Sequence, residues 1–96
     1  MSYALYLNAN ARRGLKAMPI EMQEEALDLL EELAQDPRRV KGRDPRDPDV
    51  VFEIDTKSAG VRYYVFLVVR AAHASRTVIA KRIGHVRAYI QGPGLP

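Results

Sequence analysis

The chain has 96 residues, of which 47% are hydrophobic and 28% charged, a composition typical of one globular domain. It contains no cysteine, which excludes a disulfide framework and a thiolate metal site. Its longest apolar run, residues 63–69, is far shorter than the about 20 residues that span a bilayer. We therefore expect one cytoplasmic domain over residues 1–90, with no membrane, metal or cofactor, and a flexible tail over residues 91–96.

Charge is divided unevenly along the chain. Residues 1–36 carry three basic and seven acidic side chains, whereas residues 37–96 carry twelve basic and five acidic ones. The positive field on the C-terminal half suits a polyanion such as RNA or DNA, or an acidic protein partner. A set of solvated surface charges is the alternative interpretation.

The first elements are a strand and a short helix. Residues 2–8 alternate between two faces, which is typical of a half-buried strand. Asn8 or Asn10 is a good N-cap for a helix over residues 11–18, which Gly14 weakens. A second helix is expected after this one.

The second helix, over residues 20–35, is defined by an apolar stripe at spacings of three and four residues. The stripe consists of Met22, Ala26, Leu29, Leu30 and Leu33. Glutamates lie in its first turns, where the helix dipole favours negative charge. Residues 37–49 contain repeated Asp-Pro pairs and predict a surface loop. Its Arg43 and Arg46 are candidates for phosphate contacts, although loop arginines are usually solvated.

Three further strands are expected over residues 50–56, 61–69 and 76–83, joined by short turns. The middle strand is apolar on both faces except at Arg62, so it should be central in the sheet. Gly84 is expected to end the last strand. In that strand, alternation places Thr77, Ile79 and Ile83 on one side and Val78, Ala80 and Arg82 on the other.

These elements predict an α+β domain of order β-α-α-β-β-β. Strands joined by short turns form an antiparallel meander, so the four-stranded sheet should be mostly antiparallel. Two helices can cover only one of its faces. The other face is left for solvent or a ligand.

Three short motifs resemble those of the RelE/ParE superfamily of bacterial type II toxins. They are ARRGLKAMP at residues 11–19, SAGVRYY at residues 58–64 and RIGH at residues 82–85, followed by Arg87 and Tyr89. Their order and spacing match that family. The resemblance implies a RelE-like fold and a ribosome-dependent mRNA endonuclease, or a gyrase poison in the ParE branch. It also implies a co-encoded antitoxin that holds the toxin inactive.

For a nuclease, the resemblance implies a site that contains Arg62, His85, Arg87 and Tyr89. Arg62 matches the phosphate-clamping arginine, and its planar group of donors suits phosphate oxygens. His85 can act as acid or base, because an imidazole titrates near neutral pH. Tyr89 can stack on a base or orient the phosphate. We expect Arg62 to face the other three residues across neighbouring antiparallel strands.

Other basic residues are secondary candidates. Lys81 and Arg82 could serve in the same phosphate clamp, and Lys57 could bind nucleic acid. Arg87 stands one position beyond the arginine of the family pattern, where this chain has Val86. An ion pair across the hairpin is the alternative role for Arg62.

The chain departs from the family pattern on its second strand. RelE-type enzymes often carry lysines there, whereas this chain has Glu53 and Asp55. These carboxylates weaken phosphate binding, and either of them could be the ion-pair partner of Arg62. Similarity to the YoeB-like branch implies that Glu53 can serve as the general base. Loss of nuclease activity is the other interpretation.

Three functions follow from these patterns. The first is an mRNA endonuclease toxin that acts at the ribosome and is bound by a cognate antitoxin. The second is a binding module with a toxin-like fold, which targets DNA gyrase or lacks enzymatic activity. The third is a small nucleic-acid-binding protein outside the toxin families, whose binding would depend strongly on salt.

Overall fold

The computed structural model describes residues 2–88 and contains the elements that the sequence predicts, in the predicted order. They are the strands β1 (Ala4–Leu7), β2 (Val50–Ser58), β3 (Val61–Ala72) and β4 (Thr77–Arg87), and the helices α1 (Ala9–Lys16) and α2 (Ile20–Gln35). A short 3-10 helix, η1 (Pro37–Arg39), was not predicted and lies at the start of the predicted loop. No helix within these residues is both long and apolar enough to cross a membrane. The tail over residues 91–96 lies outside the described residues.

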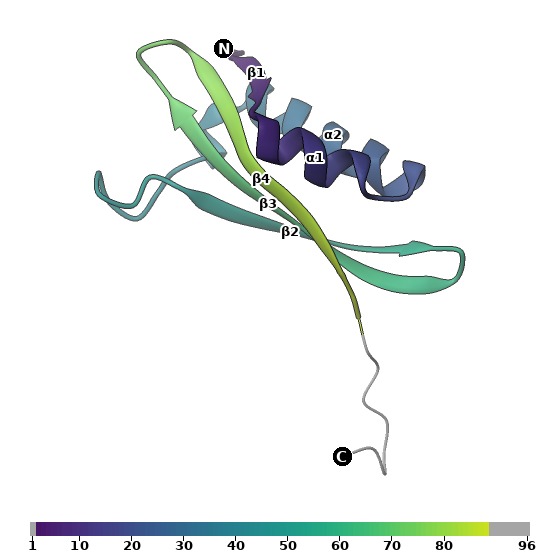
Figure 1. The fold of residues 1–96 in the computed structure, drawn as a ribbon. Coiled ribbons are helices and arrows are strands. Elements are labelled where there is room, and N and C mark those ends of the chain that lie inside the picture. Colours follow the sequence, from purple (N-terminus) through teal and green to yellow (C-terminus); the bar gives the residue numbers. More distant parts are fainter. Residues whose placement is uncertain (1, 89–96) are drawn as a thin grey trace.

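The strands form one four-stranded sheet in the order β1-β4-β3-β2. β1 runs parallel to β4, and the other two pairs are antiparallel. Both helices lie on one side of the sheet (Figure 1). The predicted α+β fold class is therefore confirmed, and one broad face of the sheet carries no helix.

The core lies between the helices and the sheet. The fully buried side chains of α2 and β3 that face each other there include Met22, Ala26, Leu30 and Leu33, and Val65, Leu67 and Val69. Two glutamates of α2 also tie the helix to β2. Thr56 Oγ1 donates to Glu25 Oε1 at 2.7 Å, and Ser58 Oγ donates to Glu21 Oε1 at 3.3 Å. These glutamates therefore hold the helix on the sheet in addition to any effect on the helix dipole.

Asn8 joins the first strand to the first helix. Its side-chain oxygen accepts a hydrogen bond from the Ala11 N–H at 2.9 Å, which makes it the N-cap. Its own N–H donates to the carbonyl of Ala80 at 3.1 Å, which extends the contact of β1 with β4. The helix therefore begins two residues earlier than the sequence predicts.

Gly14 is the residue at which α1 approaches the sheet most closely. A β-carbon at this position would lie 1.7 Å from the carbonyl oxygen of Ile83 on β4. The sequence predicts that Gly14 weakens the helix, and the structure shows what the glycine provides. Only a residue without a side chain lets the helix lie this close to the strand.

Gly84 does not end β4, so that prediction was wrong. The strand continues to Arg87, and Gly84 lies opposite Phe66 within the β3–β4 ladder. A β-carbon on Gly84 would lie 2.3 Å from the Phe66 ring. The glycine therefore makes room for an aromatic ring on the sheet, a use of glycine that a sequence pattern cannot distinguish from a break.

The regular alternation predicted for β4 was also wrong, because the strand contains a β-bulge. Val69 pairs with Ala80 and Val68 pairs with Arg82, which leaves Lys81 as an extra residue. Consequently Ala80 and Ile83 are both buried, although alternation places them on opposite sides. Arg82 and Ile83, which follow the bulge, therefore face the sides opposite to the predicted ones.

Candidate nucleic-acid interface

The uncovered face of β2, β3 and β4 gathers charged and aromatic side chains in cross-strand rows. The register gives the rows Val51–Val68–Arg82, Glu53–Phe66–Gly84, Asp55–Tyr64–Val86 and Lys57–Arg62. We call this surface the open face. Cations lie at its two ends, and the two aromatic residues lie between them.

Arg62 is on the open face and makes the ion pair that the sequence left as an alternative. Its Nε donates to Asp55 Oδ1 at 2.9 Å, and its Nη2 donates to Asp55 Oδ2. Its guanidinium carbon lies 5.5 Å from the centroid of the Tyr64 ring, within the range of a cation–π contact. The partner is therefore Asp55, and the side chain is held by two neighbours.

The ion pair shifts the protonation of both partners. The hydrogen bonds from Arg62 hold the pKa of the Asp55 carboxyl below its usual range. The same contact raises the pKa of the Arg62 guanidinium. Both side chains are therefore charged at neutral pH.

A pocket of about 620 Å³ lies at the end of the β2–β3 hairpin, next to Arg62. Its lining consists of Asp55, Lys57, Gly60, Val61, Arg62, Arg87 and Ala88. A backbone hydrogen bond of 2.8 Å from the Ala88 N–H to the Arg62 carbonyl holds the strands together here. The structure thus brings three of the predicted basic residues into one hollow.

His85 is not brought together with Arg62 and Glu53. It pairs with the fully buried Val65, so it faces the helix side of the sheet. Its ring centroid lies 5.8 Å from that of Tyr63, on the same side. The expected arrangement, with Arg62 and His85 facing each other, was wrong, because the bulge reverses the end of β4.

Of the two remaining predicted site residues, the structure describes Arg87 but not Tyr89. Arg87 pairs with Tyr63, so its backbone position belongs to the face of His85. Its exposed side chain nevertheless lines the pocket of Arg62. Tyr89 lies outside the described residues.

Glu53 lies on the open face, beside Phe66 and one row from Asp55. It is exposed and forms no ion pair with any of residues 2–88. It also lines an open groove between β2 and α2 that contains further carboxylates, those of Glu25, Asp28, Glu32 and Asp55. Its own carboxylate is thus not neutralised by a nearby cation of this part of the chain.

The bulge residue and its neighbour have different environments. Lys81 Nζ lies 2.9 Å from Asp49 Oδ2, at the start of β2. Arg82 is exposed and forms no ion pair within residues 2–88. Arg43 and Arg46 are exposed in the loop before β2 and do not line the pocket of Arg62. Arg82 is therefore the basic side chain best placed to complete the open face.

Tyr64 and Phe66 were not singled out by sequence reasoning. They follow Arg62 at two-residue intervals, so the pleat of β3 places all three on the open face. Tyr64 is 37% exposed. The spacing was a usable signal, but a strand that is apolar on both sides does not show which face is uncovered.

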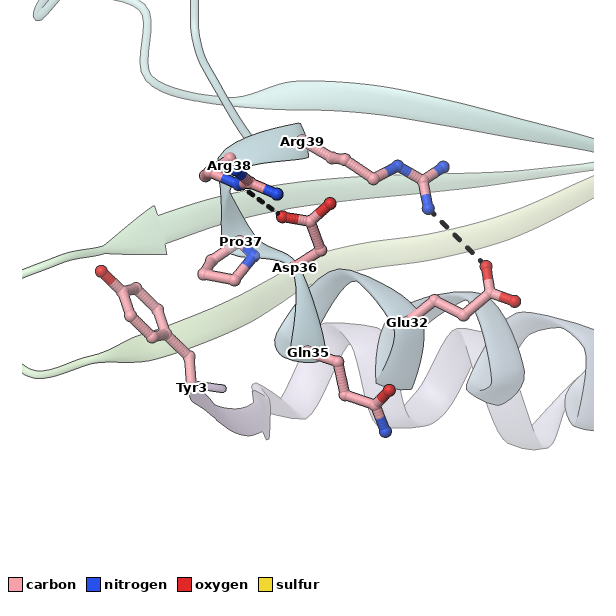
Figure 2. Close-up of a pocket in the computed structure, with 7 residues that line it drawn as sticks. All are labelled: Tyr3, Glu32, Gln35, Asp36, Pro37, Arg38 and Arg39. Carbon is pink, nitrogen blue, oxygen red and sulfur yellow. Dashed lines mark hydrogen bonds and ion pairs between the residues drawn. The ribbon is translucent and has the colours of Figure 1, made fainter. Parts of the chain in front are cut away.

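A larger pocket, of about 880 Å³, lies at the C-terminal end of α2 (Figure 2), and no residue of the open face lines it. It is lined by Tyr3, Glu32, Gln35, Asp36, Pro37, Arg38 and Arg39. Its arginines are paired within it, Arg38 with Asp36 at 2.9 Å and Arg39 with Glu32 at 3.7 Å. Size alone therefore does not select the functional site.

No group of three or more His, Cys, Asp or Glu side chains within residues 2–88 is arranged to hold a metal ion.

The fold has clear counterparts among solved structures. A chain of the toxin–antitoxin complex RelBE2 from Mycobacterium tuberculosis superposes with a TM-score of 0.70 and 21% identity, over 90% of this chain and 93% of that one. A mutant of the E. coli toxin RelE in the free state gives a TM-score of 0.64 and 22% identity, over 88% and 83%. The intact E. coli RelBE toxin–antitoxin complex gives 0.63 and 21%, over 86% and 95%.

These similarities define the class of the fold. The chain has the RelE fold, with two helices on one face of a four-stranded mixed sheet. No family model matches the sequence, and no curated protein matches it. The likeness to these toxins is thus seen in the fold and not in overall sequence similarity.

Proposed function

We propose that the protein is the toxin of a type II toxin–antitoxin system and that it cleaves mRNA on the ribosome, in the cytoplasm, without a metal ion. One observation carries the proposal: the uncovered face of a RelE fold presents arginines on both sides of Tyr64 and Phe66. Cations attract the phosphate backbone, and exposed aromatic rings stack on unpaired bases. The open face therefore has the chemistry of a single-strand RNA surface.

The open face supplies most of the groups that cleavage needs. The 2′-hydroxyl oxygen attacks the phosphorus and its proton passes to a base, for which Glu53 is exposed on the same face as Arg62. Arg62 stabilises the charge that develops on the phosphate oxygens, supported by Lys57. Arg82 lies at the other end of the open face and would bind a neighbouring phosphate of the same strand. The P–O bond to the leaving 5′-oxygen then breaks, and that oxygen takes a proton from an acid. His85 faces the helix side of the sheet, so Tyr89 is the remaining candidate for this acid.

A cognate antitoxin is the proposed protein partner. RelE toxins have been solved in complex with RelB antitoxins, and this chain covers most of the chains to which it is similar. An antitoxin with acidic residues would complement the basic C-terminal part of this chain.

The proposal is tested by producing the protein in E. coli without an antitoxin. We expect growth arrest and mRNA cleavage within translated regions, detected by primer extension. Arg62→Ala and Glu53→Gln should relieve the arrest, because they remove the phosphate contact and the base. Arg12→Ala, which removes an exposed arginine of α1 away from the open face, is the control and should remain toxic. Continued growth with intact mRNA would contradict the proposal.

A second candidate function is a binding module that targets DNA gyrase. Two observations favour it: Asp55 neutralises Arg62, and His85 faces away from Arg62 and Glu53. In that case His85→Ala should keep its effect on cells, whereas charge reversal at Arg62 or Arg87 should remove it. A DNA-damage response without mRNA cleavage would identify this function.

A further inference from the structure

The ion pair of Arg62 occupies only one edge of its guanidinium group. Nε and Nη2 donate to the two carboxylate oxygens of Asp55. A guanidinium group has five N–H donors in a plane, so this contact leaves the edge formed by Nη1 and the second Nη2 hydrogen unused. A phosphate can therefore bind Arg62 without displacing Asp55.

The orientation of the guanidinium group is restrained a second time by Tyr64. The ring lies 5.5 Å from the guanidinium carbon and belongs to the next residue on the same face of β3. Asp55 holds the group at its edge, and Tyr64 lies beneath it. The Arg62 and Asp55 side chains are still 43% and 50% exposed, so a ligand can reach them.

The surroundings show which ligand this edge suits. Arg62 lines its pocket together with Lys57 and Arg87, which makes three cations against the single carboxylate of Asp55. Glu53, two residues before Asp55 on β2, forms no hydrogen bond or ion pair with Arg62. Of the two carboxylates of β2, only that of Asp55 is paired with Arg62. Asp55 and Glu53 can therefore have different roles.

We propose that Asp55 is a positioning residue, which holds one edge of Arg62 so that the opposite edge meets the phosphate of the RNA. This inference rests on the proposed nuclease function and deepens it. It explains an acidic residue on a surface that binds a polyanion. The two hydrogen bonds from Arg62 to Asp55 give this carboxylate a role on the open face other than repulsion of the RNA.

The first test separates binding from cleavage with Asp55→Asn. Purified protein is added to a bacterial cell-free translation reaction, and mRNA cleavage is followed at increasing ribosome concentration. We expect kcat to fall by about tenfold or more, because misplacement of a charged donor slows the chemical step. Binding of a short 2′-O-methyl RNA, which cannot be cleaved, should be as tight as for the wild type or tighter, since one negative charge is lost.

Two controls exclude a general effect of charge or stability. Glu31→Gln removes the same charge from an exposed position of α2 that lines neither the pocket of Arg62 nor the groove of Glu53, and it should not lower kcat. In an Arg62→Ala background, adding Asp55→Asn should lower kcat no further, because Asp55 acts through Arg62. Cleavage by Asp55→Asn at the wild-type rate or faster would overturn the inference while leaving the nuclease function intact.

The second test does not depend on cleavage. In nitrogen-15 NMR spectra, the Arg62 Nε–H signal should be sharp in the free protein and should stay in place when the 2′-O-methyl RNA is added. The Nη signals should shift. Movement of the Nε signal to a new position would show that RNA displaces Asp55 and would overturn the inference. A wild-type protein that binds RNA with these shifts but cleaves no mRNA would overturn only the nuclease function.

Discussion

At the residue scale, the Arg62–Asp55 pair is the best-defined interaction of the open face. The two hydrogen bonds from Arg62 stabilise the ionised carboxylate, which holds its pKa below the usual value of about 3.9. The stabilisation is fully present above this usual value and is lost as the pH falls through the lowered pKa. The pair is therefore intact wherever the protein works near neutral pH.

A pH titration tests this pair directly. We expect the side-chain carbon signal of Asp55 to titrate below the value of an ordinary aspartate, and the midpoint to rise towards that value in Arg62→Ala. Carbon-13 NMR of the labelled protein measures both midpoints. Equal midpoints for Asp55 with and without Arg62 would contradict the structure.

Sequence reasoning found Arg62 but could not choose its partner. An arginine in a strand that is otherwise apolar stands out in any sequence, and two carboxylates on the preceding strand were possible partners. The register decides between them, because Lys57 pairs with Arg62 and Asp55 with Tyr64, which makes Asp55 the diagonal neighbour. Register depends on the whole hairpin and is not readable from one residue.

At the element scale, the contact of α1 with β4 depends on Gly14, and the helix propensity of that residue is misleading. Replacing a helical glycine by alanine stabilises an exposed helix by about 1 kcal/mol. Here the new β-carbon would lie 1.7 Å from the carbonyl oxygen of Ile83, which is backbone and cannot rotate away. Helix propensity therefore predicts that Gly14→Ala stabilises the protein, whereas packing predicts that it destabilises the protein.

We expect Gly14→Ala to lower the free energy of unfolding by about 1–3 kcal/mol, because overpacking outweighs propensity. Urea denaturation measures the change. Lys16→Ala, an exposed position of the same helix, is the control and should change stability by no more than about 0.5 kcal/mol. A stabilised Gly14→Ala protein would show that the helix does not approach β4 so closely.

The elements themselves were largely predictable, whereas their pairing was less so. The bounds of α2 follow from its apolar stripe and agree with the structure. The parallel pairing of β1 with β4 joins residues more than seventy positions apart, as between Ala4 and Thr77, and no local pattern reports it. The bulge was not predictable, because one extra residue shifts the pairing register of β4 without any distinctive change in the local amino-acid composition.

At the scale of the whole molecule, the division of charge follows the architecture. The acidic helix α2 lies on one side of the sheet, and the arginines of the open face lie on the other. The charge asymmetry of the sequence is thus also an asymmetry between two surfaces. RNA binding to the open face should be governed by release of counterions from the phosphates that its cations neutralise.

The salt dependence of binding tests this arrangement. For single-stranded RNA, the logarithm of the binding constant should fall with the logarithm of salt concentration by about 0.7 for each neutralised phosphate. We expect Arg82→Ala to make the slope shallower by about that amount. Arg12→Ala, which removes a charge from α1, should leave the slope unchanged. Equal slopes for the wild type and Arg82→Ala would place RNA elsewhere on the molecule.

The bulge at Lys81 has a consequence for how the C-terminal part of this chain can change in evolution. Because Ala80 and Arg82 already pair with consecutive residues of β3, loss of codon 81 would leave a regular strand with every later side chain on its present face. Loss of a codon between 82 and 87 would instead turn the remaining end of the strand over. His85 or Arg87 could then reach the open face through one deletion, with no substitution at either position.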